Sequence, residues 1–330
     1  MPTMESGATT EAKPEITMTC ADCEVRCQRF GTHRNGLRRF RCPQCKKTYT
    51  EPHRQTLGEM YASEEKVLLA LQLLIEGNSI RSTMRTTGLD GNTITKALIL
   101  AGERCDKVMA RLIVNVPVKD VQCDEIWGFV QKKEAHKFPF EKDDDSKGDA
   151  YCYVAMETHS KLVLNFALGR RNQATTDAFI EGLRHATATQ RFQISTDGFQ
   201  PYISAITTTL SDRCDYAQQI KVYAVPQDEQ RRYPPAEVVS VEEVPIMGNP
   251  DSKRICTSHI ERQNLTIRTQ MRRMTRLTNA FSKKWDNLWS AYCLHFAYYN
   301  FCRTHKTLRI TPAMEAGIAD HVWDLAELLA

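Results

Sequence analysis

The sequence predicts an α/β protein in which a mixed β-sheet follows a small cysteine-rich module and a helical module. Three observations support this prediction. Two Cys-x-x-Cys pairs lie near the start of the chain, three helical segments separated by glycine-containing turns follow, and strand-like runs alternate with helix-like runs from about residue 121. Strands and helices that alternate in this way build a sheet with helices packed against it. A chain of 330 residues has room for two or three domains.

The cysteine-rich module contains the pairs Cys20-x-x-Cys23 and Cys42-x-x-Cys45. Each pair can form one knuckle of a tetrahedral thiolate site, and the residues between them suit two short strands that bring the knuckles together. The spacing predicts a structural zinc ribbon in which these four cysteines hold one Zn²⁺. Because so short a segment has little core, the metal would supply much of its folding energy.

The first 19 residues are polar and lack the apolar centre of a secretory signal, so we expect a flexible tail there. No apolar run of about 18 residues occurs, so no membrane span is expected. The predicted setting is therefore the cytoplasm, where clustered cysteines bind metal more often than they form disulfides.

Positive charge is concentrated in two stretches of the chain. Residues 20–56 carry nine Lys/Arg against three Asp/Glu, and residues 251–310 carry twelve against three. Two separate basic blocks predict two surfaces for a polyanion such as DNA. In the ribbon, we expect DNA contacts from Arg38, Arg39 and Arg41. A ribbon used for protein contact is the alternative.

Three helices are predicted after the ribbon. Apolar residues at 67–75 indicate the first, a shorter helix is expected at about 79–87, and a longer one begins near residue 92 and continues to about 112. A short helix, a tight turn and a longer helix are typical of a helix-turn-helix. Near the start of the predicted recognition helix we expect DNA contacts from Thr93, Thr95 and Lys96. A plain three-helix packing module is the alternative.

The run QCDEIWGFV contains the first candidate acids, Asp124 and Glu125, inside a predicted strand. Neighbouring side chains of a strand point to opposite faces, so alternation alone does not choose between the two acids. Further strands are predicted at 150–158 and 161–169. Asp197 stands where another short apolar strand ends, and sites form where the strands of such sheets end. An Asp-Gly turn without function is the alternative for Asp197.

Glu261 is the third candidate acid. If Ser258 caps a helix, Glu261 takes the third helical position of a capping box, which is the structural alternative to a catalytic role. Glu261 and Arg268 are seven residues apart and so share one stripe of that helix. An acid in a basic element suits a metal ligand beside a phosphate backbone. The expected DNA contacts here are Arg262, Arg268, Arg272 and Arg273.

Phosphoryl transfer explains why three such acids would be needed. Two Mg²⁺ or Mn²⁺ ions require hard oxygen ligands that converge from separate elements. The ions clamp the attacking and the leaving oxygen of an in-line displacement. Carboxylates gathered without metal would repel one another and raise their pKa values.

Three motifs, DEIWGFV, STDGF and HIERQNLTIRTQMRRMTRLTNAFSKK, resemble those of the DDE transposases of bacterial insertion sequences of the insertion-sequence-one family. The resemblance extends over about 120–310. The zinc ribbon and the helix-turn-helix also match the arrangement of that family's amino-terminal part. The segment YYNFCRTHKTLRITPAMEAGI is similar to the C-terminal end of many integrase-like transposases.

The resemblance implies a ribonuclease-H-like core whose triad is Asp124, Asp197 and Glu261. These residues would hold two Mg²⁺ or Mn²⁺ ions. It also implies binding to terminal inverted repeats, cleavage at the element ends and joining of the 3′-hydroxyl strand to target DNA. Arg268 matches a basic position that contacts DNA in related families. Transposition requires two ends held together, so a homodimer or larger assembly on nucleoid DNA is expected.

Two other functions remain possible from the sequence: a DNA-binding regulator descended from such an enzyme, and a metal-dependent nuclease without strand transfer. The acidic loop at 141–145 and a polar insertion at 226–257 depart from the family pattern. The predicted organisation is a tail at 1–19, a zinc ribbon at 20–56, a helix-turn-helix domain at 57–116, a catalytic domain at 117–315 and a C-terminal helix at 316–330.

Overall fold

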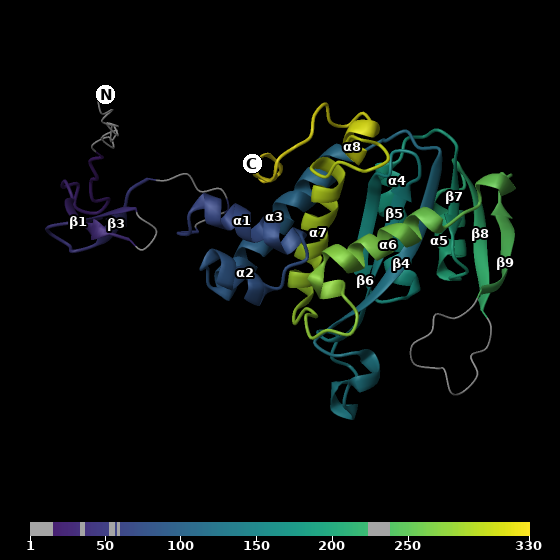
Figure 1. The fold of residues 1–330 in the computed structure, drawn as a ribbon, viewed down its shortest axis with the longest axis horizontal. Coiled ribbons are helices and arrows are strands. Elements are labelled where there is room, and N and C mark those ends of the chain that lie inside the picture. The colour runs from purple at the N-terminus through teal and green to yellow at the C-terminus, as the bar shows by residue number, and fades with distance from the viewer. Residues whose placement is uncertain (1–15, 34–36, 53–56, 58–59, 224–237) are drawn as a thin grey trace, which may run out of the picture. The chain divides into compact units, whose positions relative to one another are not determined.

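The computed structural model describes residues 16–33, 37–52, 57, 60–223 and 238–330 (Figure 1). The chain divides into two compact units. The first ends at Glu64, apart from a few residues at 56–58, and the second contains the remainder of the chain to Ala330. Residues 1–15 of the predicted tail lie outside the described residues.

The first unit is built on a three-stranded antiparallel sheet of β1 (Gln28–Thr32), β2 (Arg38–Arg41) and β3 (Thr48–Thr50). Its small core consists of Cys20, Cys27, Phe40 and Cys42. Residues 16–19 of the predicted tail are part of this unit, where the carbonyl of Met18 accepts from the backbone N–H of Cys27 at 2.7 Å.

The second unit opens with α1 (Glu64–Ile75), α2 (Ile80–Thr87) and α3 (Gly91–Leu112), close to the predicted bounds. Ser79 caps α2 through the N–H of Ser82, and Gly88 ends it in the left-handed conformation at φ 69°. The side chain of Asp90 then caps α3. These local signals explain why the sequence located the three helices well.

Helix α3 packs against α7 (Trp285–Phe301), a helix of the C-terminal part of the chain (Figure 1). The two helices approach closely at Gly102, where an added Cβ would lie 2.5 Å from the Cα of Ser290. Only glycine fits at such a contact. The helical module therefore belongs to the same compact unit as the large sheet.

The large sheet has six strands in the order β6-β5-β4-β7-β8-β9. Strands β4, β5 and β6 are antiparallel neighbours, β7 and β8 run parallel to β4, and β9 is antiparallel to β8, so the sheet is mixed as predicted. The strands are β4 (Asp120–Val130), β5 (Gly148–Glu157), β6 (Val163–Gly169), β7 (Phe192–Thr196), β8 (Cys214–Tyr223) and β9 (Val238–Met247).

The stretch predicted as an insertion, 226–257, contributes to the sheet. Residues 226–237 lie outside the described residues, but β9 pairs with β8 along most of its length and forms the edge of the sheet. A short 3₁₀ helix, Ser252–Arg254, follows it. Val238 and Val239 are adjacent and Glu242 and Glu243 are adjacent, so the segment lacks the alternation of apolar and polar residues that would predict this mostly exposed strand.

Helices cover the two faces of the sheet. Helices α4 (Gln173–Ala186) and α5 (Pro201–Thr209) pack together on one face, and α6 (Ser258–Gln270) crosses the other face over β4 and β5 (Figure 1). Successive side chains of β4 point to opposite faces, so Gln122 and Glu125 report on different faces of the sheet. Gln122 accepts hydrogen bonds from the first turns of α6, whereas the Glu125 carboxylate accepts one from Tyr202 of α5.

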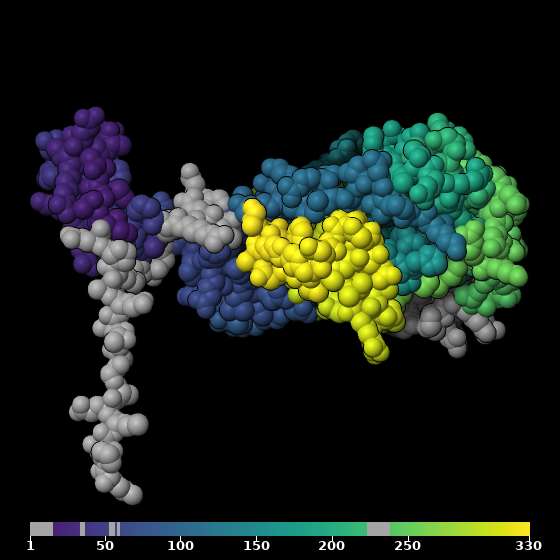
Figure 2. Space-filling model, turned by 90° about the horizontal axis from the view of Figure 1, so that it is seen from above, coloured from purple at the N-terminus to yellow at the C-terminus, as the bar shows by residue number. Residues whose placement is uncertain are grey.

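The prediction of a C-terminal helix over 316–330 was wrong. Only α8 (Pro312–Glu315) and α9 (Leu325–Leu328) are helical in this part of the chain. Gly317 adopts φ 71°, which ends α8, and Asp324 caps a new short helix. The C-terminal segment, yellow in Figure 2, lies against residues coloured blue there. Arg104 of α3 donates to the carbonyl of Leu329. None of the helices in the described part of the chain is both long and apolar enough to span a bilayer.

Candidate functional site

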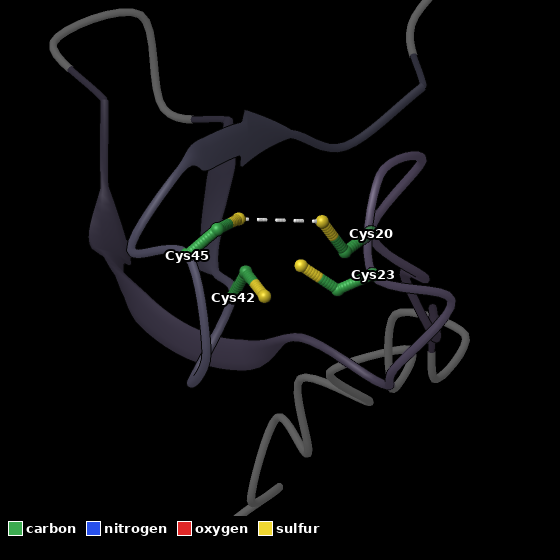
Figure 3. Close-up of side chains that lie close together, drawn as sticks. All are labelled: Cys20, Cys23, Cys42 and Cys45. Atoms are coloured by element: carbon green, nitrogen blue, oxygen red, sulfur yellow. Dashed lines mark hydrogen bonds between the residues drawn. The ribbon is translucent and has the colours of Figure 1, made fainter.

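Four thiols converge in the first unit. The sulfur atoms of Cys20, Cys23, Cys42 and Cys45 all lie within 4.8 Å of one another and point toward a common centre (Figure 3). The Cys20 and Cys45 sulfurs are 3.6 Å apart. Zn–S bonds of about 2.3 Å in a tetrahedron require sulfurs about 3.8 Å apart. The four cysteines therefore fit a zinc ion.

The two knuckles have the same backbone geometry. The N–H of Glu24 donates to the carbonyl of Cys20, and the N–H of Lys46 donates to that of Cys42. Glu24 and Lys46 both take positive φ, at 56° and 63°. This matching turn after the first cysteine of each pair aims both thiols of a pair at the same point. A fifth thiol of this unit, that of Cys27, is buried in the small core but does not belong to the four-sulfur group.

Hydrogen bonding makes the thiols unequal. The Tyr49 hydroxyl, 3.0 Å from the Cys20 sulfur, lowers the pKa of Cys20 to about 6. The neighbouring thiol of Cys45 raises the pKa of Cys23 to about 12. Zinc binds thiolates. The Cys20 thiol loses its proton most readily, whereas zinc binding must displace the proton of the Cys23 thiol.

The arginines of β2 have different partners. Arg38 donates to both oxygens of Glu51, through its backbone N–H at 2.8 Å and its side chain at 2.5 Å. Arg39 and Arg41 instead lie over the exposed ring of Phe30, with centroid distances of 5.5 and 5.0 Å. An aromatic ring beneath two guanidinium groups forms a cationic patch on this unit.

A second group of possible metal ligands lies where β7 ends, beside the middle of β4. The parallel register pairs Val121 with Ile194 and Gln122 with Ser195. Continued by two residues, this register brings Asp124 beside Asp197. Carboxylate oxygens of Asp124, Glu125 and Asp197 all lie within 4.8 Å of one another. This group can hold a divalent cation through hard oxygen ligands.

Asp124 is held from the α6 side. Its Oδ2 accepts from Asn264 Nδ2 at 2.8 Å, and its Oδ1 accepts from the backbone N–H of Glu125. Burial, and then the charges of Asp197 and Glu125, raise the pKa of Asp124 to about 7. Within the described residues, Asn264 Oδ1 is buried without a hydrogen-bond partner. A buried carboxylate with a raised pKa and an unpaired oxygen beside it fit a site for a cation.

Glu125 faces the opposite side of the sheet, yet its carboxylate reaches the same group. Both of its oxygens are occupied, Oε1 by Arg171 Nε at 2.5 Å and Oε2 by the Tyr202 hydroxyl at 3.1 Å. Burial and the charge of Asp197 raise the pKa of Glu125, and Arg171 and Tyr202 oppose that shift. Arg171 also lies 3.7 Å from Asp197, so one guanidinium counters two carboxylates.

Glu261 stands near this acidic group but outside it. Its Oε1 accepts from Thr257 Oγ1 at 2.7 Å and from Lys221 Nζ. Its charge contributes to the raised pKa of Asp124. The capping box on Ser258 did not form, because Thr257 occupies the N-cap position and Ser258 begins the helix.

Asn264 and Arg171 are among the residues of this site that had not been predicted. Asn264 is three residues after Glu261, on the same helix face, so helical spacing from the predicted acid could have found it. Arg171 follows β6 and reaches Glu125 from 46 positions away in the chain. No local pattern in the sequence marks that contact.

The arginines of residues 251–310 that were predicted to contact DNA differ in exposure and in their partners. Arg262 and Arg272 are exposed. Arg268 donates to the backbone carbonyls of Trp127 at 3.1 Å and Met274 at 3.2 Å, and thus ties α6 to β4. Arg273 donates to the hydroxyl of Ser282 at 2.9 Å and is mostly buried.

The DNA contacts predicted at the start of α3 also differ in how exposed they are. Lys96 is exposed, and Thr93 is half-buried. Thr95 donates to the carbonyl of Gly91 at 2.8 Å and lines a cavity between helices.

No protein-family model matches the chain, and no curated protein matches it.

Proposed function

We propose that the protein is a DNA transposase that cleaves at the ends of an insertion sequence and joins the 3′-hydroxyl strand to target DNA. The observation that carries the proposal is the convergence of Asp124 and Asp197 from adjacent parallel strands, with Glu261 close by on α6. The mixed six-stranded sheet is compatible with the ribonuclease-H-like core that the resemblance of the three motifs implies.

The proposed metal ligands are Asp124, Asp197 and Glu261. Two Mg²⁺ ions bound by these carboxylates would activate the attacking water or 3′-hydroxyl and stabilise the leaving oxygen. Asn264 fixes the Asp124 carboxylate, and Thr257 orients that of Glu261.

Glu125 has a positioning role in this proposal. Because Arg171 and Tyr202 occupy both of its oxygens, Glu125 holds Arg171 against Asp197 and is not itself a ligand. Arg171 lies on the Phe199 ring, with its guanidinium carbon 3.9 Å from the centroid, which fixes it further.

DNA binding is proposed for both units. The cationic patch around Phe30 on the first unit and the exposed Lys96 and Arg262 on the second would contact phosphates. The four-cysteine site would hold Zn²⁺ and fold the first unit around it. A homodimer or larger assembly would hold two element ends.

The proposal is tested with purified protein, Mg²⁺ and a labelled duplex that carries the DNA flanking the protein's own gene. Wild type should cut this duplex and join its 3′ end to a second DNA. Asp124→Asn and Asp197→Asn should each bind the duplex and leave it uncut. Cleavage without joining would favour the metal-dependent nuclease, and binding without cleavage by wild type would favour the regulator.

A further inference from the structure

A cavity of about 790 Å³ lies among helices of the second unit, away from the acidic group. It is bounded by the end of α1, by α2 and α3, by residues 271–283 and by α7, elements that lie beside one another in Figure 1. Small-molecule sites commonly occupy about 300–1,000 Å³. The cavity is therefore large enough for a ligand of several rings or groups.

The wall of the cavity is cationic and apolar. Four basic side chains line it, and none of the described lining residues is acidic. The apolar part of the wall includes Met84, Leu98 and Phe281. The basic lining residues are Arg81, Arg272, Arg273 and Lys283. This combination suits an anion that carries an apolar, ring-like body.

Two buried polar groups in the wall lack partners within the described residues. Arg273 Nη2 and His295 Nε2 are both out of contact with solvent and without a hydrogen bond. Burial lowers the pKa of Arg273 to about 10, as expected for a guanidinium with no anion beside it, and burial keeps the His295 imidazole neutral by lowering its pKa to about 3. A buried donor without an acceptor is destabilising, so a shift of the Arg273 side chain that brings Nη2 to an acceptor in the cavity would be favoured.

We propose that this cavity binds a nucleotide, with the phosphate on the arginine-lined side of the wall and the base against Phe281 and Met84. A guanidinium matches phosphate through charge-assisted hydrogen bonds. An aromatic ring and a thioether are surfaces on which a base packs irrespective of its identity.

The nucleotide has two possible sources. It is either a free mononucleotide or an unstacked nucleotide of DNA bound at α2 and α3, two of the helices that line the cavity. The second source rests on the proposed function, because it requires DNA on this unit. The first does not.

The free source is tested by titrating full-length, zinc-loaded protein with dAMP, with deoxyadenosine and with inorganic phosphate. If dAMP binds, it should bind more tightly than either of its halves. Arg273→Met should weaken that binding about tenfold to a hundredfold. Ala291→Phe, which fills the cavity from α7 without removing a polar group, should abolish it. Arg276→Met, an exposed arginine outside the cavity wall, should leave it unchanged.

The DNA source is tested without Mg²⁺, so that no strand cleavage is needed. Duplexes carrying 2-aminopurine at successive positions are mixed with wild type and with Ala291→Phe. A fluorescence change at one position with wild type, absent with Ala291→Phe although the duplex is still bound, supports the DNA source.

Binding of dAMP that depends on Arg273 supports the free source, even if the protein proves to cut no DNA. The proposal is overturned if dAMP does not bind and if, in addition, no 2-aminopurine position shows a fluorescence change with wild type that is absent with Ala291→Phe. Loss of binding by Arg273→Met alone, with Ala291→Phe behaving as wild type, would also overturn it, because the effect would then come from structure and not from the cavity.

Discussion

Replacing Asp124 with Asn should make the Mg²⁺-free protein more stable at pH 8. Burial, and then the charges of Asp197 and Glu125, raise the pKa of Asp124 from the ordinary 3.8 to about 7. Asparagine keeps the shape and can still accept from Asn264, but it carries no charge. The substitution therefore removes a charge that the folded protein accommodates poorly.

The magnitude follows from the pKa shift. A rise of about three pKa units at about 1.4 kcal/mol per unit gives an upper bound of about 4 kcal/mol at pH values above 7. The loss of other contacts by the new side chain would reduce this gain, so we expect about 2–4 kcal/mol.

The pH dependence has a defined sign. The folded-state pKa lies above the unfolded one, so between pH 4 and 7 the folded protein binds more protons than the unfolded chain. The stability of wild type relative to Asp124→Asn should therefore fall as the pH rises through this window. Near pH 4 the advantage of Asp124→Asn should have disappeared, and wild type should be at least as stable, because the amide loses one of the two hydrogen bonds that the Asp124 oxygens accept.

Urea unfolding followed by tryptophan fluorescence measures this difference. All four tryptophans lie in the second unit, so the signal reports the unit that contains Asp124. Asp145→Asn, at a side chain that is 96% exposed, is the control and should change little. Mg²⁺ should stabilise wild type and not Asp124→Asn. Equal stability of the two proteins at pH 8, or a difference that does not vary with pH, would refute the reasoning.

Three further outcomes are expected. Cys42→Ser should lose its zinc, and a metal analysis that still finds one zinc per chain would exclude the four-cysteine site. Gly102→Val should lower the free energy of unfolding by about 1–3 kcal/mol or more, because its Cβ would clash with Ser290, and an unchanged urea midpoint would contradict this packing. Lys221→Met should remove the ion pair with Glu261 and leave that carboxylate free to bind Mg²⁺. The Mg²⁺ concentration for half-maximal cleavage should then fall about two- to fivefold, the size of effect typical of an exposed ion pair. An unchanged Mg²⁺ requirement would show that Lys221 does not compete with the metal for this carboxylate.

The sequence located most of the elements because their signals are local. Ser79, Gly88 and Asp90 bound the helices directly, and the apolar runs at 121–130 and 192–197 are buried strands. The prediction failed at 316–330, where Gly317 ends one helical turn and nine residues pass before the next. Short helices held by tertiary contacts leave little periodicity in the sequence.

The acidic group was only partly predictable. Strand alternation placed Asp124 and Glu125 on opposite faces, which is correct, but it did not reveal that both carboxylates approach Asp197, where β7 ends beside the middle of β4. The contacts of Glu125 with Arg171 and Tyr202 span 46 and 77 positions. Such contacts depend on how the helices pack on the sheet, and no pattern within one segment encodes them.

The most direct test compares Glu261→Gln with Glu125→Gln in the same strand-transfer assay with Mg²⁺. Both substitutions remove one carboxylate charge near Asp124. If the metal ligands are Asp124, Asp197 and Glu261, then Glu261→Gln should abolish cleavage and joining. Glu125→Gln, which keeps an oxygen for the Tyr202 hydroxyl, should retain measurable activity. Retained activity in Glu261→Gln together with its loss in Glu125→Gln would contradict the account and assign the site to Asp124, Glu125 and Asp197.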